Sequence, residues 1–141
     1  MSLPEIKRDW SLANEFKRTK QCRVCGKVAG QVEKFELAHV IGTEHDLKDC
    51  SITEWQGHSV RLAVVRPSRV ITLCGPAVNT GTCHNLYDSH RLDIWDDLTD
   101  VEKDQAIEDA GGIGPALHRC APLTWLERTE IVEGKTIEVA A

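Results

Sequence analysis

The sequence predicts a small α+β domain whose fold is stapled by a bound metal ion. Two pairs of cysteines lie far apart in the chain: Cys22 and Cys25 form one knuckle, and Cys74 and Cys83 form the second. The segment between the knuckles is rich in β-forming residues, whereas helical patterns precede and follow it. Because two pairs of thiolates can close one tetrahedral site, we expect these four cysteines to bind a structural Zn2+.

Length and composition indicate one domain that gains stability from the metal. The chain has 141 residues, of which 41% are hydrophobic and 5% aromatic, so the core that it can bury is modest. Zinc binding to cysteine sites contributes about 10–16 kcal/mol in small peptides, and much of this appears as folding free energy. No apolar run approaches the ~20 residues of a membrane span, and no signal-peptide core is present. We therefore expect a cytoplasmic protein with no membrane partner, in which paired cysteines bind metal more often than they form disulfides.

The first 20 residues are expected to form a helix. Trp10, Ala13 and Phe16 recur at helical spacing, which predicts an amphipathic helix over residues 3–19. Beyond it, apolar alternation and β-branched residues predict strands, and a polar, charge-rich stretch predicts a loop. The expected strands are 31–40, 59–65 and 69–73, with Pro67 separating the last two, and the expected loop is 41–59.

The C-terminal third is predicted to be helical. Thr99 and Glu102 form a capping box for a helix that Gly111 and Gly112 end. The expected helices are 83–94, 99–110 and 115–120, followed by a weak strand or tail over 131–139. The chain thus divides into an N-terminal helix over 1–20, a zinc-containing core over 21–95, and a C-terminal helical extension and tail over 96–141.

Charge is distributed unevenly along the chain. The net charge of −5 by itself disfavours a nucleic-acid partner. Residues 4–36, however, carry eight basic and five acidic side chains, so this basic half can face phosphates. Residues 93–109 carry eight acidic side chains and one lysine, a run that we interpret as the solvated surface of a helix.

The order of these motifs resembles that of the HNH endonucleases, in particular the zinc-containing members of phages and bacteria. The resemblance covers residues 21–94, roughly half of the chain, and depends on three stretches that occur in the family's order. These stretches are Cys22-Arg-Val-Cys25-Gly26, then Glu36-Leu-Ala-His39-Val-Ile-Gly42 with Glu44-His45-Asp46, and finally Val70-Ile-Thr-Leu-Cys74-Gly75 through Cys83-His84-Asn-Leu-Tyr-Asp88-Ser-His90. The resemblance implies a ββα-metal (His-Me finger) fold and metal-dependent hydrolysis of DNA phosphodiester bonds, by nicking or cleavage.

The resemblance implies catalytic roles for three histidines. In this family the histidine at the end of the first strand is the general base, and His39 matches that position. The histidine at the start of the helix binds a catalytic divalent cation, Mg2+ or another, and His84 matches it. Asp88 lies four residues later, on the same helix face, and is the expected second ligand. We expect His90 to contact phosphate or to bind the metal.

Three features depart from the family pattern. Many members carry Asp or His directly before the base, where this chain has Ala38, so we expect His45 or Asp46 to supply the missing ligand. The asparagine that ties the hairpin loop in the family falls near Arg69, which we expect to contact phosphate instead. The net acidity is the third departure, and it predicts modest DNA affinity or help from a partner protein.

The expected partner is DNA, without strong sequence preference, and a protein of a phage packaging or restriction system is a second possible partner. The alternative function is a non-catalytic zinc module that binds nucleic acid or protein in such a system. The set of His39, His84, Asp88 and His90 distinguishes the two functions, because a zinc module has no need of it. A thioredoxin-like redox pair is disfavoured, since the flanks lack a βαβ pattern and a second knuckle is present.

Overall fold

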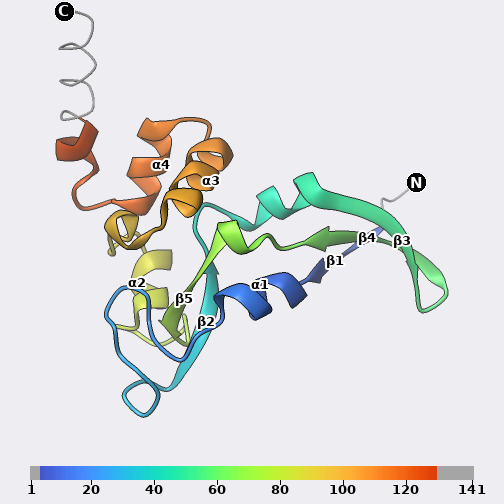
Figure 1. Cartoon of the computed structure of the whole chain (residues 1–141), viewed down its shortest axis with the longest axis horizontal. Coiled ribbons are helices and arrows are strands. Elements are labelled where there is room, and N and C mark those ends of the chain that lie inside the picture. The colour runs from blue at the N-terminus through green and yellow to red at the C-terminus, as the bar shows by residue number, and fades with distance from the viewer. Residues whose placement is uncertain (1–3, 130–141) are drawn as a thin grey trace, which may run out of the picture.

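The computed structural model, which describes residues 4–129, is an α+β fold with two separate sheets (Figure 1). One sheet is an antiparallel pair, and the other has three strands in the order β1-β4-β3, in which β1 runs parallel to β4. The strands are β1 (Glu5–Asp9), β2 (Lys34–His39), β3 (Cys50–Trp55), β4 (His58–Val64) and β5 (Val70–Gly75). The three-stranded sheet is therefore built largely from the segment inserted between β2 and β5.

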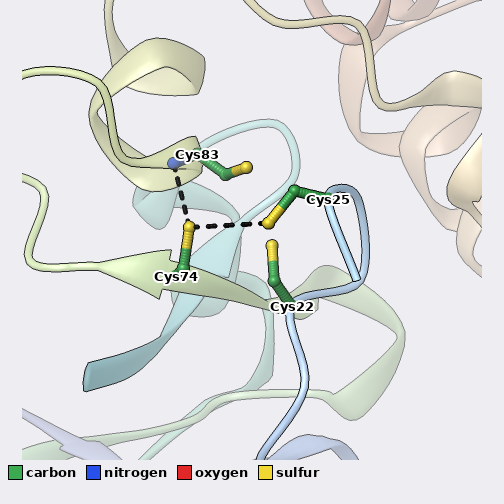
Figure 2. A group of neighbouring side chains, drawn as sticks. All are labelled: Cys22, Cys25, Cys74 and Cys83. Atoms are coloured by element: carbon green, nitrogen blue, oxygen red, sulfur yellow. Dashed lines mark hydrogen bonds between the residues drawn. The ribbon is translucent and has the colours of Figure 1, made fainter. Parts of the chain in front are cut away.

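Strands β2 and β5 and the helix that follows them form the centre of the molecule. The strands pair in a register that places Lys34 opposite Gly75 and His39 opposite Val70. Every residue of β5 is buried, since β2 pairs with it and helices α1 (Ser11–Lys17) and α2 (Cys83–Asp88) both contact it. Helix α2 is capped by Thr82, whose hydroxyl accepts a hydrogen bond from the backbone N–H of Asn85, and the first residue of the helix faces β5 (Figure 2).

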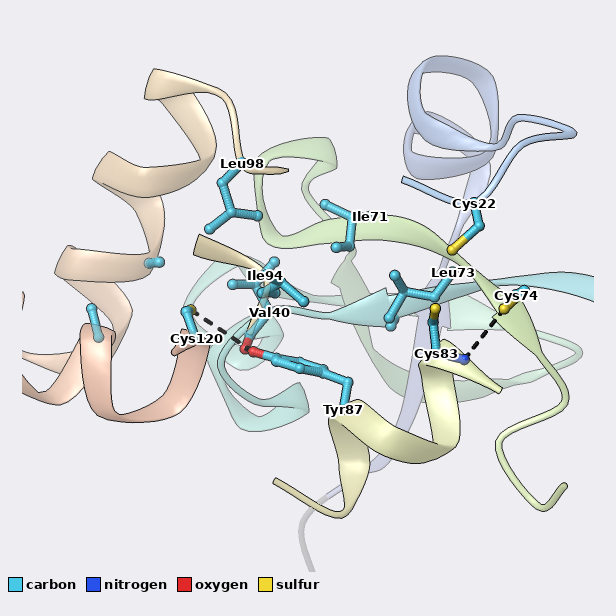
Figure 3. Close-up of a cluster of buried hydrophobic side chains, with 13 residues drawn as sticks. Cys22, Val40, Ile71, Leu73, Cys74, Cys83, Tyr87, Ile94, Leu98 and Cys120 are labelled. Carbon is cyan, nitrogen blue, oxygen red and sulfur yellow. Dashed lines mark hydrogen bonds between the residues drawn. The ribbon is translucent and has the colours of Figure 1, made fainter. Parts of the chain in front are cut away.

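The main hydrophobic core lies between this unit and the C-terminal helices (Figure 3). Tyr87 of α2 is fully buried beside Ile71, Leu73 and Ile94, and its hydroxyl donates to the backbone carbonyl of Val40. Burial raises the pKa of Tyr87, so the phenol stays a neutral donor. Helices α3 (Asp100–Ala110) and α4 (Ile113–Cys120) contribute the remaining wall of this core.

The capping box predicted at Thr99 is present, and its glutamate has a second role. Glu102 is buried, and its carboxylate pairs with Lys17 and with Arg23, the latter at 2.7 Å. Burial alone would raise the pKa of Glu102, but the hydrogen bonds from Arg23 and Lys17 outweigh it and hold the pKa below its ordinary value. The interpretation of the acidic run as solvated surface is therefore wrong for Glu102 and for the buried Asp109.

Two predictions of secondary structure are wrong. The expected helix over 3–19 is strand β1 followed by the short helix α1 (Ser11–Lys17), because residues 5–9 pair with β4, a partner distant in sequence. The expected loop over 41–59 contains a 3-10 helix, η1 (Thr43–Asp49), and strand β3, which also forms by pairing with β4. Both strands are largely polar, so their local pattern did not indicate a sheet.

The remaining elements match their predictions with shifted ends. Helix α2 ends at Asp88 rather than at residue 94, and His90 just beyond it has a left-handed backbone with φ of 60°. The strands expected at 31–40, 59–65 and 69–73 correspond to β2, β4 and β5, and the last two expected helices to α3 and α4. The strand or tail expected over 131–139 lies outside the described residues. No helix in the described part of the chain is long and apolar enough to cross a membrane.

Arg69 ties the start of β5 to helix α3 instead of facing solvent. Its side chain is 3% exposed and donates to Asp109 through Nε at 2.9 Å and through Nη2 at 3.2 Å, while Nη1 donates to Asp49 at 2.6 Å. Burial would raise the pKa of Asp109, but the bonds to Arg69 outweigh it and lower the pKa. Three of the five N–H donors of the guanidinium thus bond to carboxylates within the protein, and the side chain is buried between β5 and α3.

We predict that Arg69→Met lowers the free energy of unfolding by about 3–5 kcal/mol, the usual cost of leaving buried charges without their partner. Arg66→Met is the matched control, because Arg66 also pairs with Asp49 but its side chain is 46% exposed, so the loss should be about 0–1 kcal/mol. Urea unfolding followed by circular dichroism measures both. The lowered pKa of Asp109 means that the Arg69 contribution is present at neutral pH and disappears as pH falls through that pKa. Equal effects of the two substitutions at neutral pH would contradict this role of Arg69.

Candidate metal centre and adjoining histidine pocket

The four knuckle cysteines meet in one cluster, as the sequence predicts (Figure 2). Their sulfur atoms all lie within 4.8 Å of one another. Cys22 and Cys25 come from a turn that Gly26 closes with a backbone hydrogen bond of 3.1 Å to the Cys22 carbonyl and a φ of 74°. Cys74 lies near the end of β5 and Cys83 is the first residue of α2. Three segments that are distant in sequence thus converge on the same point.

The geometry of the cluster fits a metal and not a disulfide. The sulfur atoms of Cys25 and Cys74 are 3.9 Å apart, far beyond the ~2.05 Å of a disulfide bond. A tetrahedron with metal–sulfur bonds of ~2.3 Å has sulfur–sulfur edges of about 3.8 Å. The backbone N–H of Cys83 donates to the Cys74 sulfur at 3.2 Å, a contact typical of metal-bound thiolates.

The electrostatics of the cluster also favour a bound cation. Burial would raise the pKa of Cys22, but backbone N–H donors, first that of Cys25, outweigh it and lower the pKa to about 7. Burial raises the pKa of Cys83, and the neighbouring Cys22 thiolate raises it further. Burial likewise raises the pKa of Cys74. Four thiolates are therefore stable together only around a positive ion, and the cluster can hold a metal such as zinc.

A pocket of about 340 Å3 lies where the end of β2 meets helix α2. It brings together His39 from the end of β2 with His84 and Asp88 from α2, so three of the expected site residues share one cavity. The remaining lining residues come from β2, from the residue before α1, from the segment after β2 and from α4. They are Trp10, Leu37, Ile41, Gly42, Thr43 and Arg119.

His84 is oriented by Glu36, a residue to which the sequence assigned no role. Its Nδ1–H donates to Glu36 Oε1 at 2.9 Å, and the backbone N–H of Ala77 donates to the same oxygen at 2.8 Å. Burial would raise the pKa of Glu36, but these two bonds outweigh it and keep the carboxylate ionised. Since an ionised carboxylate only accepts, Nδ1 donates to it, and in the neutral imidazole Nε2 then has the free lone pair. Nε2 lies 3.6 Å from Asp88 Oδ2.

His39 has a carboxylate partner of its own. Its Nε2 lies 2.8 Å from Asp46 Oδ2, and the same oxygen accepts a hydrogen bond of 3.1 Å from Arg8 Nε. The edge of the Trp10 ring contacts the imidazole, with ring centroids 5.4 Å apart. Asp46, which the sequence analysis offered as a replacement metal ligand, thus contacts the expected base.

Two other histidines lie apart from the pocket. His90 is exposed after the end of α2 and does not line the cavity. His45 faces Glu44 at 3.5 Å and does not line it either. By contrast, Arg119 of α4 lines the rim, stacked 3.8 Å from the centre of the Tyr87 ring. No sequence signal pointed to Arg119, because only the packing of α4 against α2 brings it to the pocket. The role of Glu36 could have been predicted, because Glu36 lies two residues before Ala38 and therefore on the same face of β2.

In comparisons with known proteins, no protein-family model, no curated protein and no solved structure matches this chain.

We predict that protein purified without chelator contains one equivalent of zinc, because the cluster offers four sulfur ligands and its thiolates need a cation. Cys74→Ser should lose the metal and unfold or aggregate. Cys50→Ser is the matched control, since Cys50 lies outside the cluster and should leave zinc content and stability unchanged. Elemental analysis and thermal denaturation measure these quantities. Fully stable wild-type protein without zinc would contradict the prediction.

Proposed function

We propose that this chain is a metal-dependent HNH-type endonuclease that hydrolyses phosphodiester bonds of DNA. The observation that supports the proposal is the pocket in which His39, His84 and Asp88 meet. His39 comes from the first of two paired strands, and His84 and Asp88 come from the helix that follows the second, which is the order of the family that the motifs resemble. In this proposal β2, β5 and α2 form the ββα-metal unit, and the cysteine cluster holds its helix against its second strand.

The donor atoms on α2 suit a hard divalent cation such as Mg2+. His84 Nε2 and Asp88 Oδ2 lie 3.6 Å apart, and neither has a proton to offer the other once Nδ1 carries the imidazole proton. Two ligand atoms at about 2.1 Å from one ion can have this separation. Magnesium sites commonly use one or two carboxylates and complete the shell with water and substrate phosphate, so a ligand at the position of Ala38 is not required.

The residues around the pocket then have distinct roles in hydrolysis. The Nδ1 atom of His39 accepts a proton from the attacking water, whose oxygen bonds to phosphorus. A phosphorus–oxygen bond to the sugar breaks, and the departing oxygen takes up a proton from solvent. His84 and Asp88 hold the cation, which when bound neutralises charge on the phosphate and on the departing oxygen. Arg119 at the rim adds positive charge where the phosphate enters.

A basic groove leads to this pocket and supports DNA as the partner. A cavity of about 540 Å3 between α1 and β2 shares Trp10 and Leu37 with the histidine pocket, and Arg18 and Lys34 line it. A further cavity of about 420 Å3 continues it past Lys20. These cations can follow a phosphate backbone without reading its bases, which favours binding with little sequence preference.

We predict that the protein nicks supercoiled plasmid with at least one of Mg2+, Mn2+, Ni2+ and Zn2+. His39→Ala should slow cleavage by about 10²–10⁴-fold, because a lost general base costs that much. The variant should retain metal and DNA binding, and the binding should weaken steeply as salt concentration rises. Each quantity is measured at equal protein concentration, by gel assay for cleavage and by fluorescence anisotropy for binding.

His58→Ala is the matched control, since His58 lies on β4 away from the pocket and should leave the rate unchanged. A His39→Ala rate equal to wild type would show that the base is another group. Absence of cleavage with all four metals would favour the alternative, a non-catalytic zinc module that binds nucleic acid or protein.

A further inference from the structure

The carboxylate that holds His39 comes from outside the paired strands and is completely buried. Asp46 belongs to the 3-10 helix η1, and its side chain is 0% exposed. Its Oδ2 atom lies 2.8 Å from His39 Nε2 and 3.1 Å from Arg8 Nε, and Arg8 Nη2 also donates to the Thr43 carbonyl at 3.2 Å. Thus β1 supplies Arg8, η1 supplies Asp46, and both converge on the last residue of β2.

We propose that Asp46 is a positioning residue for His39, which accepts the Nε2–H hydrogen bond and keeps Nδ1 free to take the proton from water. The inference builds on the proposed function, because it assigns a partner to the base of that reaction. It also gives the inserted segment a role: the segment carries the group that selects one form of the imidazole.

The direction of the hydrogen bond follows from the chemistry of the groups. A neutral imidazole has one N–H, and an ionised carboxylate paired with Arg8 can only accept. The proton therefore resides on Nε2, and the lone pair resides on Nδ1. The other charged or titratable groups at this pocket are His84 and Asp88 of α2 and Arg119 of α4.

The Oδ1 atom of Asp46 supports a role for this residue beyond stabilising the fold. Asp46 Oδ1 is buried and has no hydrogen-bond partner among the described residues. An unsatisfied buried oxygen costs free energy, and native structures contain few of them. Anchoring η1 does not need this arrangement, because Arg8 already bonds to the Thr43 carbonyl of the same helix. Besides the bond from Arg8, the contact that a side-chain acceptor at position 46 provides is the bond to His39.

Three variants and two measurements test the proposal. Asp46→Ala removes the acceptor, Asp46→Asn retains an oxygen acceptor of the same shape, and Glu44→Ala is the matched control. Glu44 lies on the same 3-10 helix, is 70% exposed and contacts His45 rather than His39. Nitrogen-15 NMR of the His39 ring, at a pH where it is neutral, reports which nitrogen carries the proton. Plasmid nicking with Mg2+ or Mn2+ gives kcat and KM.

We expect the Nε2–H form in the wild type and in Asp46→Asn, and a mixture of the two forms in Asp46→Ala. We expect kcat to fall about 10–100-fold in Asp46→Ala with KM unchanged, and to recover largely in Asp46→Asn. A purely structural role would lower stability without changing the tautomer or separating kcat from KM. A wild-type proton on Nδ1, or an unchanged tautomer in Asp46→Ala, would overturn the proposal. If Asp46→Ala does not fold, the wild-type and Asp46→Asn spectra still decide it.

The NMR measurement and the nicking assay test the role of Asp46 and the nuclease activity separately. The tautomer is measured without DNA, so it tests the role of Asp46 even if the wild type cuts no plasmid. Failure of the nuclease proposal is read from the wild-type assay, whereas failure of the positioning role is read from the imidazole spectrum.

Discussion

The cluster of four cysteines is the constraint on which the arrangement of the pocket depends. It joins the turn before β2, the end of β5 and the start of α2, and a cation bound among the sulfurs offsets the repulsion between neighbouring thiolates. Because Cys83 is followed directly by His84, anchoring the first residue of α2 also places the next one over the pocket. Cys74 anchors the end of β5 in the same way, and the pairing of β5 with β2 fixes the position of His39 at the pocket.

Buried ion pairs supply the second set of constraints in a chain with a modest apolar core. Glu102 connects α3 to Lys17 of α1 and to Arg23 of the first knuckle, while Arg69 connects the start of β5 to Asp109 of α3. Each pair joins segments that are distant in sequence, and the Glu102 pairs combine the acidic C-terminal run with the basic N-terminal half. Some of the unevenly distributed charges therefore form ion pairs inside the fold. Others remain at the surface, where Arg18 and Lys34 line the groove beside β2.

The parts of the molecule that could be predicted from sequence are those with local or spacing signals. The capping box at Thr99 depends on neighbours three residues apart, and the cysteine pairs depend on the donor preferences of zinc. Strands β1 and β3 could not be predicted, because they exist by pairing with β4. The contacts of Glu36 with His84 and of Asp46 with His39 join positions that no local pattern links, so only the three-dimensional fold brings them together.

The central claim is that a zinc-stapled pair of strands and a helix create a second cation site beside His39. Titration of Mn2+ into the zinc-loaded protein tests it most directly, since the paramagnetic ion broadens NMR signals of nearby groups. The account predicts the strongest broadening at His84 and Asp88, weaker broadening at His39, and no loss of zinc from the cysteines. Broadening confined to the acidic surface of α3, with these three side chains unaffected, would contradict it.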